Sequence, residues 1–406
     1  MSVGAGNKIL IVYHFFYPDD VASARHFSDL AEGLAKRNWD VTVLTSNRFC
    51  RHPSKKVLIK KETWKGVKII RSHRPPFNQA NVCLRIINSI WLAVTWTFKI
   101  IFMREFDMIV LGTDPQFLYY TVPIIKLFKR KSKIVHWMHD LYPEAIIRSK
   151  IRVLSNIFKH SKPLTKFCYR FINLMVDIGP CMKKRLGKYE HNAETATLVP
   201  WALSEPTEIP IVDIESRLKL FGNTKLGVLY SGTIGDAHEF ELFLKLARKL
   251  KRRNASVAFC FAGRGNRYDH LKKSVNEGDT NISFTGFADE SELERRLSSA
   301  DIHMLSLREG WEGIAIPSKF FGSLASGRPV LYSGAEKSAI KEWIETYRIG
   351  FYLSKYNIDQ IADKLIGFTD DKGKLLKMQH NSFYAYNKHF SKKVVMDKWD
   401  ILLRNL

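Results

Sequence analysis

Residues 315–331 read AIPSKFFGSLASGRPVL, and this stretch predicts a loop, a helix and a buried strand in quick succession. Pro317 suits the first turn of a helix, where a missing N–H costs nothing. Gly327 suits the end of that helix, and Pro329 forbids its continuation. The helix start with Lys319 beside it predicts an anion site. The plain alternative is a well-capped αβ unit that binds nothing.

The composition indicates a globular chain with a strong positive charge. With 406 residues, 45% of them hydrophobic, the chain is long enough for two or three domains. The net charge of +24 favours an anionic partner, such as an anionic membrane or a phosphorylated small molecule. We expect no nucleic-acid partner, because aromatic residues are not interleaved with basic runs in any nucleic-acid motif.

The cysteines and the first residues indicate where the chain is expected to work. The five cysteines show neither metal-ligand spacing nor a disulfide framework, which is typical of a reducing compartment. The polar N-terminus lacks an apolar signal region. We therefore expect a cytoplasmic location.

Strand and helix patterns alternate in two parts of the chain. Apolar strand patterns at residues 8–13 and 41–44 flank a helical pattern, which predicts a βαβ unit and a parallel sheet. The alternation lapses after residue 200 and begins again at Gly227. We expect an α/β fold of two Rossmann-like doubly wound domains facing a cleft. The expected parts are a domain over 1–200, a linker over 201–224, a domain over 225–385, and a helix over 386–406 that packs back on the N-terminal domain.

Two further segments of the first half carry their own patterns. Residues 56–71 alternate and turn, which predicts a hairpin-like insertion. Residues 85–103 form the most apolar stretch, with large apolar side chains at helical spacing and several polar interruptions. We interpret it as a core helix of a soluble domain, and a helix lying in a membrane surface is the alternative. The apolar positions are Ile87, Ile90, Trp91, Val94, Phe98, Ile101 and Phe102.

Three loops of the second half follow predicted strands and point to one anionic ligand. The loop at 231–238 reads SGTIGDAH, and its two glycines let a backbone approach a phosphate closely. The second loop contains Arg264, a natural phosphate donor, between Gly263 and Gly265. The third is the stretch around Lys319. Each alone also fits an ordinary surface turn, but their shared position at strand carboxyl ends indicates a phosphate site.

At these residues the chain resembles the large family 4 of retaining glycosyltransferases, which have the two-domain GT-B architecture. The resemblance covers nearly the whole chain and is similar to the branch that builds bacterial surface polysaccharides from UDP-sugars. Its most specific part is the pairing of residues 230–232 (YSG) with 317–319 (PSK). Other matching segments are residues 17–20 (YPDD), 140–144 (DLYPE), 179–182 (GPCM), 198–202 (LVPWA) and 284–288 (FTGFA).

The resemblance implies a nucleotide-sugar site in the C-terminal domain, with the donor diphosphate above residues 232–235. Thr233 and His238 stand where much of the family has arginine and lysine, so Arg264 and Lys319 are expected to supply the charge. Ile314 and Gly322 stand at the positions of the family's paired glutamates, and upstream Glu309 and Glu312 are candidates to replace the first. The implied donor-binding residues are Gly232, Thr233, Gly235, His238, Gly263, Arg264, Phe287, Ser318, Lys319 and Gly322, with Glu309 catalytic.

The resemblance also implies that the N-terminal domain binds the acceptor. His139 and Asp140 end a strand and are expected to orient a hydroxyl of the transferred sugar or to take the acceptor proton. Asp140 could instead cap the next helix. Glu144, one turn later, has the same two possible roles, binding the acceptor or capping the helix. Asp19, Asp20 and Arg25 are expected to meet the acceptor.

The expected mechanism needs neither a metal ion nor another cofactor. The sequence has no acidic pair in the loop context of a metal-assisted transferase, so Arg264, Lys319 and helix N-termini are expected to balance the charge on the departing UDP. Retention without an obvious nucleophile fits a same-face displacement, in which the departing phosphate accepts the proton.

Basic and apolar residues are interleaved between residues 126 and 171. This pattern predicts a surface that attaches to the anionic inner face of a membrane, close to a polyprenyl-diphosphate-linked acceptor. A solvated helix face is the alternative.

The prediction is therefore a glycosyltransferase of hexosyl or N-acetylhexosaminyl type, acting on a nucleotide-sugar donor and a lipid-linked or oligosaccharide acceptor in cell-surface glycan biosynthesis. A nucleotide-sugar epimerase of the same architecture and a degenerate, binding-only subunit of a polysaccharide assembly complex stay open as alternatives.

Overall fold

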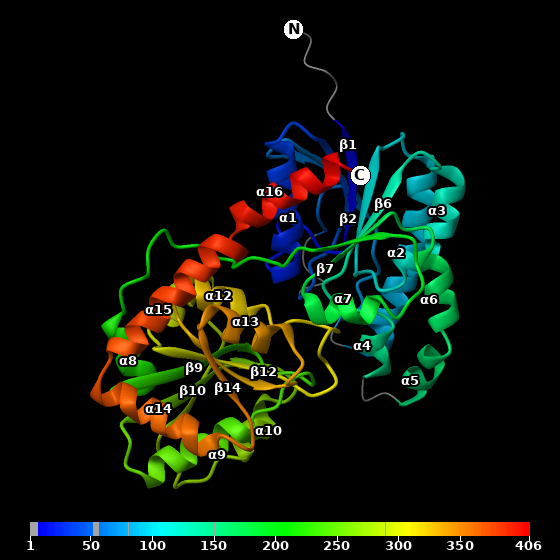
Figure 1. Ribbon diagram of the computed structural model, residues 1–406. Helices are drawn as coiled ribbons and strands as arrows, with labels where there is room; N and C mark the ends of the chain where they lie inside the picture. Colours follow the sequence, from blue (N-terminus) through cyan, green and yellow to red (C-terminus); the bar gives the residue numbers. More distant parts are fainter. Residues whose placement is uncertain (1–6, 52–56, 80, 149–151, 289) are drawn as a thin grey trace. The chain divides into compact units, whose positions relative to one another are not determined.

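A computed structural model of the protein describes residues 7–51, 57–79, 81–148, 152–288 and 290–406. The chain divides into two compact units, each built around its own sheet (Figure 1). Unit 1 comprises Met1–Val199, Gly313–Ala315 and Val395–Leu406, and unit 2 comprises Pro200–Glu312 and Ile316–Val394. The predicted α/β fold with two Rossmann-like domains is confirmed.

The sheet of unit 1 has eight strands, and all neighbours are parallel except the hairpin β3–β4. Its central strands are apolar runs buried on both faces, as a parallel sheet covered by helices requires. The hairpin predicted over 56–71 is β3–β4, and Lys56 lies outside the described residues. In sheet order the strands are β3 (Lys61–Trp64), β4 (Val67–Ser72), β2 (Asp40–Ser46), β1 (Lys8–Val12), β5 (Met108–Gly112), β6 (Lys133–Trp137), β7 (Leu174–Asp177) and β8 (Glu194–Thr197).

Helices cover both faces of this sheet: α1 and α16 (Lys392–Arg404) lie on one side, and α2, α3 and α6 lie on the other (Figure 1). The helices before α16 are α1 (Ala22–Ala35), α2 (Val82–Phe102), the 3-10 helix η1 (Leu118–Thr121), α3 (Val122–Phe128), α4 (Glu144–Ile147), α5 (Arg152–Lys159), α6 (Lys162–Tyr169) and α7 (Pro180–Leu186).

The long helix α2 corrects the prediction of a core helix over 85–103. Its inner face is buried, but most of the apolar positions expected to face the core point to solvent instead. The reason is that the helix is apolar all round, so periodicity alone could not say which face the sheet would cover. By length and composition α2 is long and apolar enough to cross a membrane.

The sheet of unit 2 has six parallel strands in the order β11 (Ile282–Thr285), β10 (Val257–Arg264), β9 (Leu226–Thr233), β12 (Ile302–Leu307), β13 (Val330–Gly334) and β14 (Gly350–Leu353). The strand and helix predicted for 315–331 are confirmed as α12 and β13. The helices of this unit are α8 (Ile214–Phe221), α9 (Glu241–Arg252), α10 (Tyr268–Lys273), α11 (Glu290–Ser298), α12 (Lys319–Ala325), α13 (Ala339–Tyr347), α14 (Ile358–Asp370), α15 (Gly373–Ala385) and the π-helix η2 (Tyr386–Phe390).

The structure differs from the predicted domain boundaries at the linker and at the C-terminal tail. The linker expected over 201–224 contains α8, whose N-cap Asp213 accepts a hydrogen bond from Ser216 N at 2.7 Å. Phe221 at its end packs into the core of unit 2. The tail expected to begin at 386 stays in unit 2 as far as Val394, because the ring of Phe390 packs against Phe320, Phe321 and Trp343.

The last turns of α16 complete the core of unit 1. The ring of Trp399 lies 5.2 Å from that of Trp137, centre to centre, and Trp399 is fully buried. Trp39 Nε1 donates to Asp400 Oδ1 at 2.7 Å. Met396 fills the space beside Gly33 of α1, where a side chain has no room.

Candidate functional site

The first candidate region is the carboxyl end of the unit 2 sheet, where β9 and β10 end beside the start of α12. The register pairs Gly232 with Gly263 and Thr233 with Arg264, so the two predicted loops lie side by side. We call the seven residues of this region the unit 2 cluster: Gly232, Thr233, Gly235, His238, Gly263, Arg264 and Lys319.

Lys319 is the centre of the unit 2 cluster. Its side chain crosses the place where a Cβ on Gly232 would lie: such an atom would be 2.3 Å from Cε and 3.2 Å from Nζ of the lysine. The Nζ donates to Thr233 O at 3.5 Å and lies 5.1 Å from the ring centre of Tyr230. Burial lowers the pKa of Lys319 to about 8, so the ammonium form still predominates at neutral pH.

The glycines of the unit 2 cluster provide space rather than donors. A side chain on Gly263 would collide with Gly232 O at 2.0 Å, which fixes close contact between the two strand ends. Two main-chain N–H groups expected under a diphosphate are already engaged: Ile234 N donates to Arg264 O at 2.8 Å, and Gly235 N donates to His238 Nδ1 at 3.2 Å. Both amide groups therefore make hydrogen bonds within the turn itself.

His238 is neutral rather than cationic. Burial lowers its pKa to about 3, and the positive charges of Lys319 and Arg267 act in the same direction. Nδ1 lies 3.2 Å from Gly235 N and 3.3 Å from Gly235 O, so whether it accepts or donates depends on the tautomer of the ring. The carbonyl of His238 is held by Arg267 Nη1 at 2.9 Å.

Arg264 and Phe287 lie together, as the sequence predicted for neighbouring loops. The guanidinium carbon of Arg264 is 4.0 Å from the ring centre of Phe287, which is a cation–π contact. Both side chains are exposed. A flat ring and a flat cation on the surface provide a stacking platform beside the cluster.

The remaining predicted donor residues lie around the unit 2 cluster. Ser318 is exposed and is the N-cap of α12, and Gly322 lies one turn further with 3.8 Å to its nearest neighbour, so a side chain would fit there. Glu309 is exposed after β12, next to Arg308, whose N–H donates to Ala237 O at 2.7 Å. Glu312 is half-buried.

The second candidate region is the carboxyl end of the unit 1 sheet, where β6 runs into His139 and Asp140. Burial and, after it, the negative charge of Asp114 raise the pKa of Asp140 to about 6. Asp140 forms an isolated bridge with Ala315, and the cap of α4 is Pro143, so the helix-cap alternative for Asp140 is wrong.

His139 packs among aromatic rings. Its ring centre is 4.4 Å from that of Trp137 and 5.4 Å from that of Phe27. Burial and the neighbouring His26 lower its pKa, so the imidazole is neutral. Its Nε2 is buried and has no hydrogen-bond partner within the described part of the chain.

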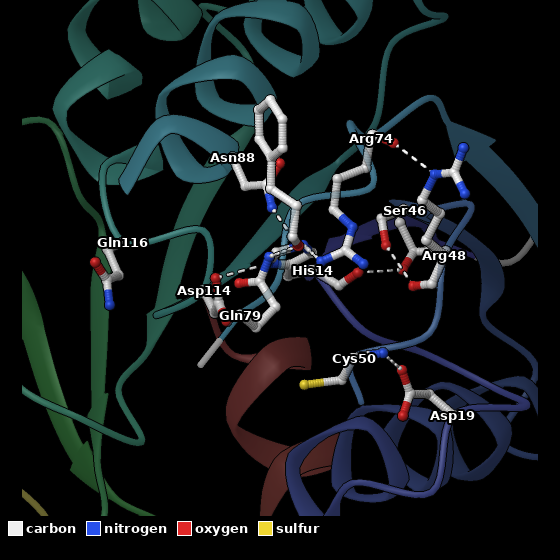
Figure 2. Close-up of polar contacts among 12 residues, drawn as sticks. His14, Asp19, Ser46, Arg48, Cys50, Arg74, Gln79, Asn88, Asp114 and Gln116 are labelled. Atoms are coloured by element: carbon white, nitrogen blue, oxygen red, sulfur yellow. Dashed lines mark hydrogen bonds and ion pairs between the residues drawn. The ribbon is translucent and has the colours of Figure 1, made fainter. Parts of the chain in front are cut away.

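A buried polar relay that the sequence analysis missed stands beside Asp140. His14 Nδ1 is 2.8 Å from Asp114 Oδ1, and Arg74 Nη1 is 3.5 Å from His14 Nε2 (Figure 2). Burial lowers the pKa of His14 despite Asp114. A neutral ring that accepts from Arg74 donates from Nδ1, which holds the Asp114 carboxylate in one orientation.

These three residues come from the ends of β1, β4 and β5, far apart in sequence. Their positions in the sequence could have identified them, because each polar residue follows a strand. His14, for example, follows the apolar residues 8–13. Asp114 follows the apolar strand β5 in the same way, but it was not among the predicted site residues.

Most of the other predicted acceptor residues make hydrogen bonds or ion pairs with neighbouring segments. Asp19 is buried and accepts from Cys50 N at 2.6 Å (Figure 2), and Asp20 pairs with Arg51 at 2.8 Å on the surface. Arg25 is half-buried in the first turn of α1, and Glu144 accepts from the hydroxyl of Tyr189. Asp19 and Glu144 therefore have structural partners that explain them.

Metal ligands do not converge at either region: among the described residues, no three histidine, cysteine, aspartate or glutamate side chains are grouped to hold an ion. All five cysteines are free thiols.

Comparison with known proteins gives a family match over part of the chain and a distant relative. Residues 225–371 match the family described as Glycosyl transferases group 1. The probable glycosyltransferase WbjE of Pseudomonas aeruginosa is 23% identical over 287 residues, which cover 68% of this chain and 70% of that protein.

Solved structures share the architecture of the whole chain. The sucrose-phosphate synthase of Thermosynechococcus elongatus aligns with a TM-score of 0.75 at 14% identity over 98% of both chains. HepE of Anabaena, solved in complex with UDP, aligns with a TM-score of 0.65 at 13% identity over 98% of this chain and 100% of its own. WaaG, a glycosyltransferase involved in lipopolysaccharide biosynthesis, aligns with a TM-score of 0.63 at 13% identity over 97% of this chain and 99% of its own.

The solved structures show the GT-B fold. The match of residues 225–371 and the likeness to WbjE support a glycosyltransferase of group 1. The predicted resemblance is confirmed to that level. Membership of family 4, the UDP-sugar donor and the roles of individual residues stay predictions.

Proposed function

We propose that this protein is a retaining glycosyltransferase that transfers a sugar from a nucleotide sugar, UDP-linked by preference, to a lipid-linked or oligosaccharide acceptor in cell-surface glycan biosynthesis. The observation that carries the proposal is the Lys319 ammonium lying over Gly232 at the carboxyl end of the unit 2 sheet. A cation beside a surface with no side chain suits a diphosphate. The complexes of HepE with UDP and with UDP-glucose support the choice of nucleotide.

The donor is proposed to bind the unit 2 cluster through side chains. Lys319 and Arg264 neutralise the two phosphates, and the neutral imidazole of His238 lies beside them. Phe287 and the strand end at Gly263 form the wall against which the base lies. Because these cations are part of the chain, we propose that leaving-group charge is balanced without a metal ion.

The acceptor is proposed to bind unit 1 near Asp140. A carboxyl group with a pKa of about 6 is mostly ionised at neutral pH, and it orients an acceptor or sugar hydroxyl. In the proposed step the bond between the anomeric carbon and the β-phosphate oxygen breaks. The acceptor oxygen bonds to that carbon on the same face, and its proton passes to the departing phosphate, so UDP leaves with the proton.

The proposal is tested by UDP binding and by sugar transfer. Calorimetric titration of Lys319→Ala should show UDP affinity about 10- to 100-fold below the unchanged protein, because a charge-assisted contact is lost. The matched control is Lys272→Ala, an exposed lysine of α10, which should bind UDP normally. Equal affinity in the two variants would contradict the proposed donor site.

Further measurements test metal independence, retention of configuration and the two alternative functions. Transfer that survives a chelator supports metal independence, and the anomeric configuration of the product, read by NMR, reports retention or inversion. Turnover of a UDP-sugar without any acceptor would indicate an epimerase, and binding without turnover of any nucleotide sugar would indicate a binding-only subunit.

A further inference from the structure

The long helix α2 presents an apolar stripe to solvent. Six large side chains lie on its outer surface and share one side of the helix for about 22 Å. We call them the α2 face: Ile87, Ile90, Trp91, Val94, Phe98 and Phe102. A stripe of this length is uncommon on a surface that meets only water.

The inner side of α2 fixes the direction of the α2 face. Asn88 Nδ2 donates to Phe77 O at 3.2 Å, and Thr97 Oγ1 donates to Thr121 Oγ1 at 2.7 Å. Trp96 and Ile100 are fully buried. Because the helix is held on its inner side against η1 and α3, it cannot rotate the α2 face inward or leave the unit as a spanning helix without breaking this core.

Neighbouring helices extend the apolar surface. Ile124, Leu127 and Phe128 of α3, which packs on α2, are exposed. Leu164 and Phe167 are exposed on α6, which packs on η1 (Figure 1). The apolar surface therefore spreads over several helices of unit 1.

The charged side chains of these helices are all positive. The sequences of α2, η1, α3, α5 and α6 contain no aspartate or glutamate. Basic side chains that are exposed in these helices or within five residues after them are Arg130, Lys131, Lys133, Lys159, Lys162 and Arg170. Apolar side chains beside an excess of positive charge match the interface of an anionic bilayer, where tails meet headgroups.

We propose that the α2 face and the exposed apolar side chains of α3 insert into the headgroup region of an anionic membrane, with the basic side chains binding its headgroups. The prediction of a basic surface over 126–171 is thereby extended to α2, and its residues 149–151 lie outside the described residues. This inference deepens the proposed function, because membrane binding would bring unit 1 to a lipid-linked acceptor. Only this purpose of the surface rests on the proposed function. A second copy of the chain is the less suitable occupant, because two such positive surfaces repel each other.

Vesicle binding tests the surface directly. The unchanged protein should sediment with vesicles of phosphatidylcholine and phosphatidylglycerol, and binding to phosphatidylcholine alone should be at least about tenfold weaker. The double variant Phe98→Ser with Leu127→Ser should bind the anionic vesicles about tenfold more weakly, because two apolar anchors are lost.

A matched control exists elsewhere on the chain. Phe98 and Leu127 are 62% and 59% exposed, and Tyr384 and Ile401 are 63% and 61% exposed on α15 and α16. The double variant Tyr384→Ser with Ile401→Ser should bind the vesicles like the unchanged protein. Equal losses in both double variants, or equal binding to neutral and anionic vesicles, would overturn the proposal.

Two further readouts separate other outcomes. Lipids with a quencher in the upper acyl chain should quench fluorescence of the unchanged protein more than that of Trp91→Phe. If the protein is a dimer in solution and Phe98→Ser with Leu127→Ser makes it a monomer, the face is a protein interface and the proposal is wrong. UDP affinity of the same variant should be unchanged, so failure of membrane binding and failure of the proposed donor site are distinguishable.

Discussion

The carboxyl ends of the two sheets have opposite chemistry. In unit 2 the end is made of glycines with the two basic side chains of Lys319 and Arg264. In unit 1 the end is made of Asp114 and Asp140 with neutral histidines, fixed by a buried arginine. The cationic end suits a diphosphate, and the carboxylate end suits hydroxyl groups. This difference underlies the proposal that donor and acceptor bind different units, and each prediction below changes one of the two ends.

The largest effect is expected from Asp140→Asn. The amide keeps the size of the side chain and removes its charge, so sugar transfer should fall about 100-fold or more. UDP affinity, measured by titration, should stay unchanged because the donor binds the other unit. Asp363→Asn, a surface carboxylate paired with Arg253, is the control for both measurements. A variant that loses UDP binding along with transfer would break the assignment of separate roles.

The next effect concerns Gly232→Ala. A Cβ there would overlap Lys319, and the backbone φ of +135° is strained for any side chain, so UDP affinity should fall about tenfold or more. Gly367→Ala is the matched control, since nothing lies within 4 Å of its Cβ position in helix α14. That variant should bind UDP normally and raise the free energy of unfolding by about 0.5–1 kcal/mol. Similar UDP affinities for the two would show that Lys319 does not need the empty position.

A smaller effect on UDP affinity is expected from a change of pH. With a pKa of about 8, Lys319 is cationic below that value and loses its charge as the pH rises through it. UDP affinity should therefore weaken by about fivefold to tenfold between about pH 7 and pH 9, where the phosphate charge is constant. Lys319→Arg should remove this dependence, because arginine stays charged. The same slope in both proteins would assign the titration to another group.

The smallest effect is expected from Asp114→Asn. Burial is the main cause of the raised pKa of Asp140 and Asp114 is the second, so the variant should move the acidic limb of the transfer rate to lower pH by a fraction of a unit. The rate at neutral pH should change less than in Asp140→Asn. An unchanged limb would mean that Asp140 is not the group that titrates.

The comparison also explains what the sequence could predict. The fold was predictable because apolar runs such as those of β1 and β9 show in a single window. The unit 2 cluster was recognised because its residues stand in three short segments, two at the ends of β9 and β10 and the third at the start of α12. His14, Arg74 and Asp114 were missed because they meet only when β1, β4 and β5 are assembled, and no local pattern links them.

Two other features needed the structure for different reasons. The outward direction of the α2 face depends on Asn88 and Thr97, two polar residues that looked like interruptions and turned out to hold the buried side. The low pKa of His238 follows from burial near Lys319, which composition does not reveal.

The chain leaves unit 1 after Val199 and returns for Gly313–Ala315 and for the last residues of α16. During synthesis, the ribosome has therefore finished every strand of unit 2 before Trp399 emerges to cover Trp137. The unit that is started first is completed last, and a fragment that stops at Val199 lacks part of its own interior. Expression of unit 1 alone would require α16 to be reattached through a designed loop.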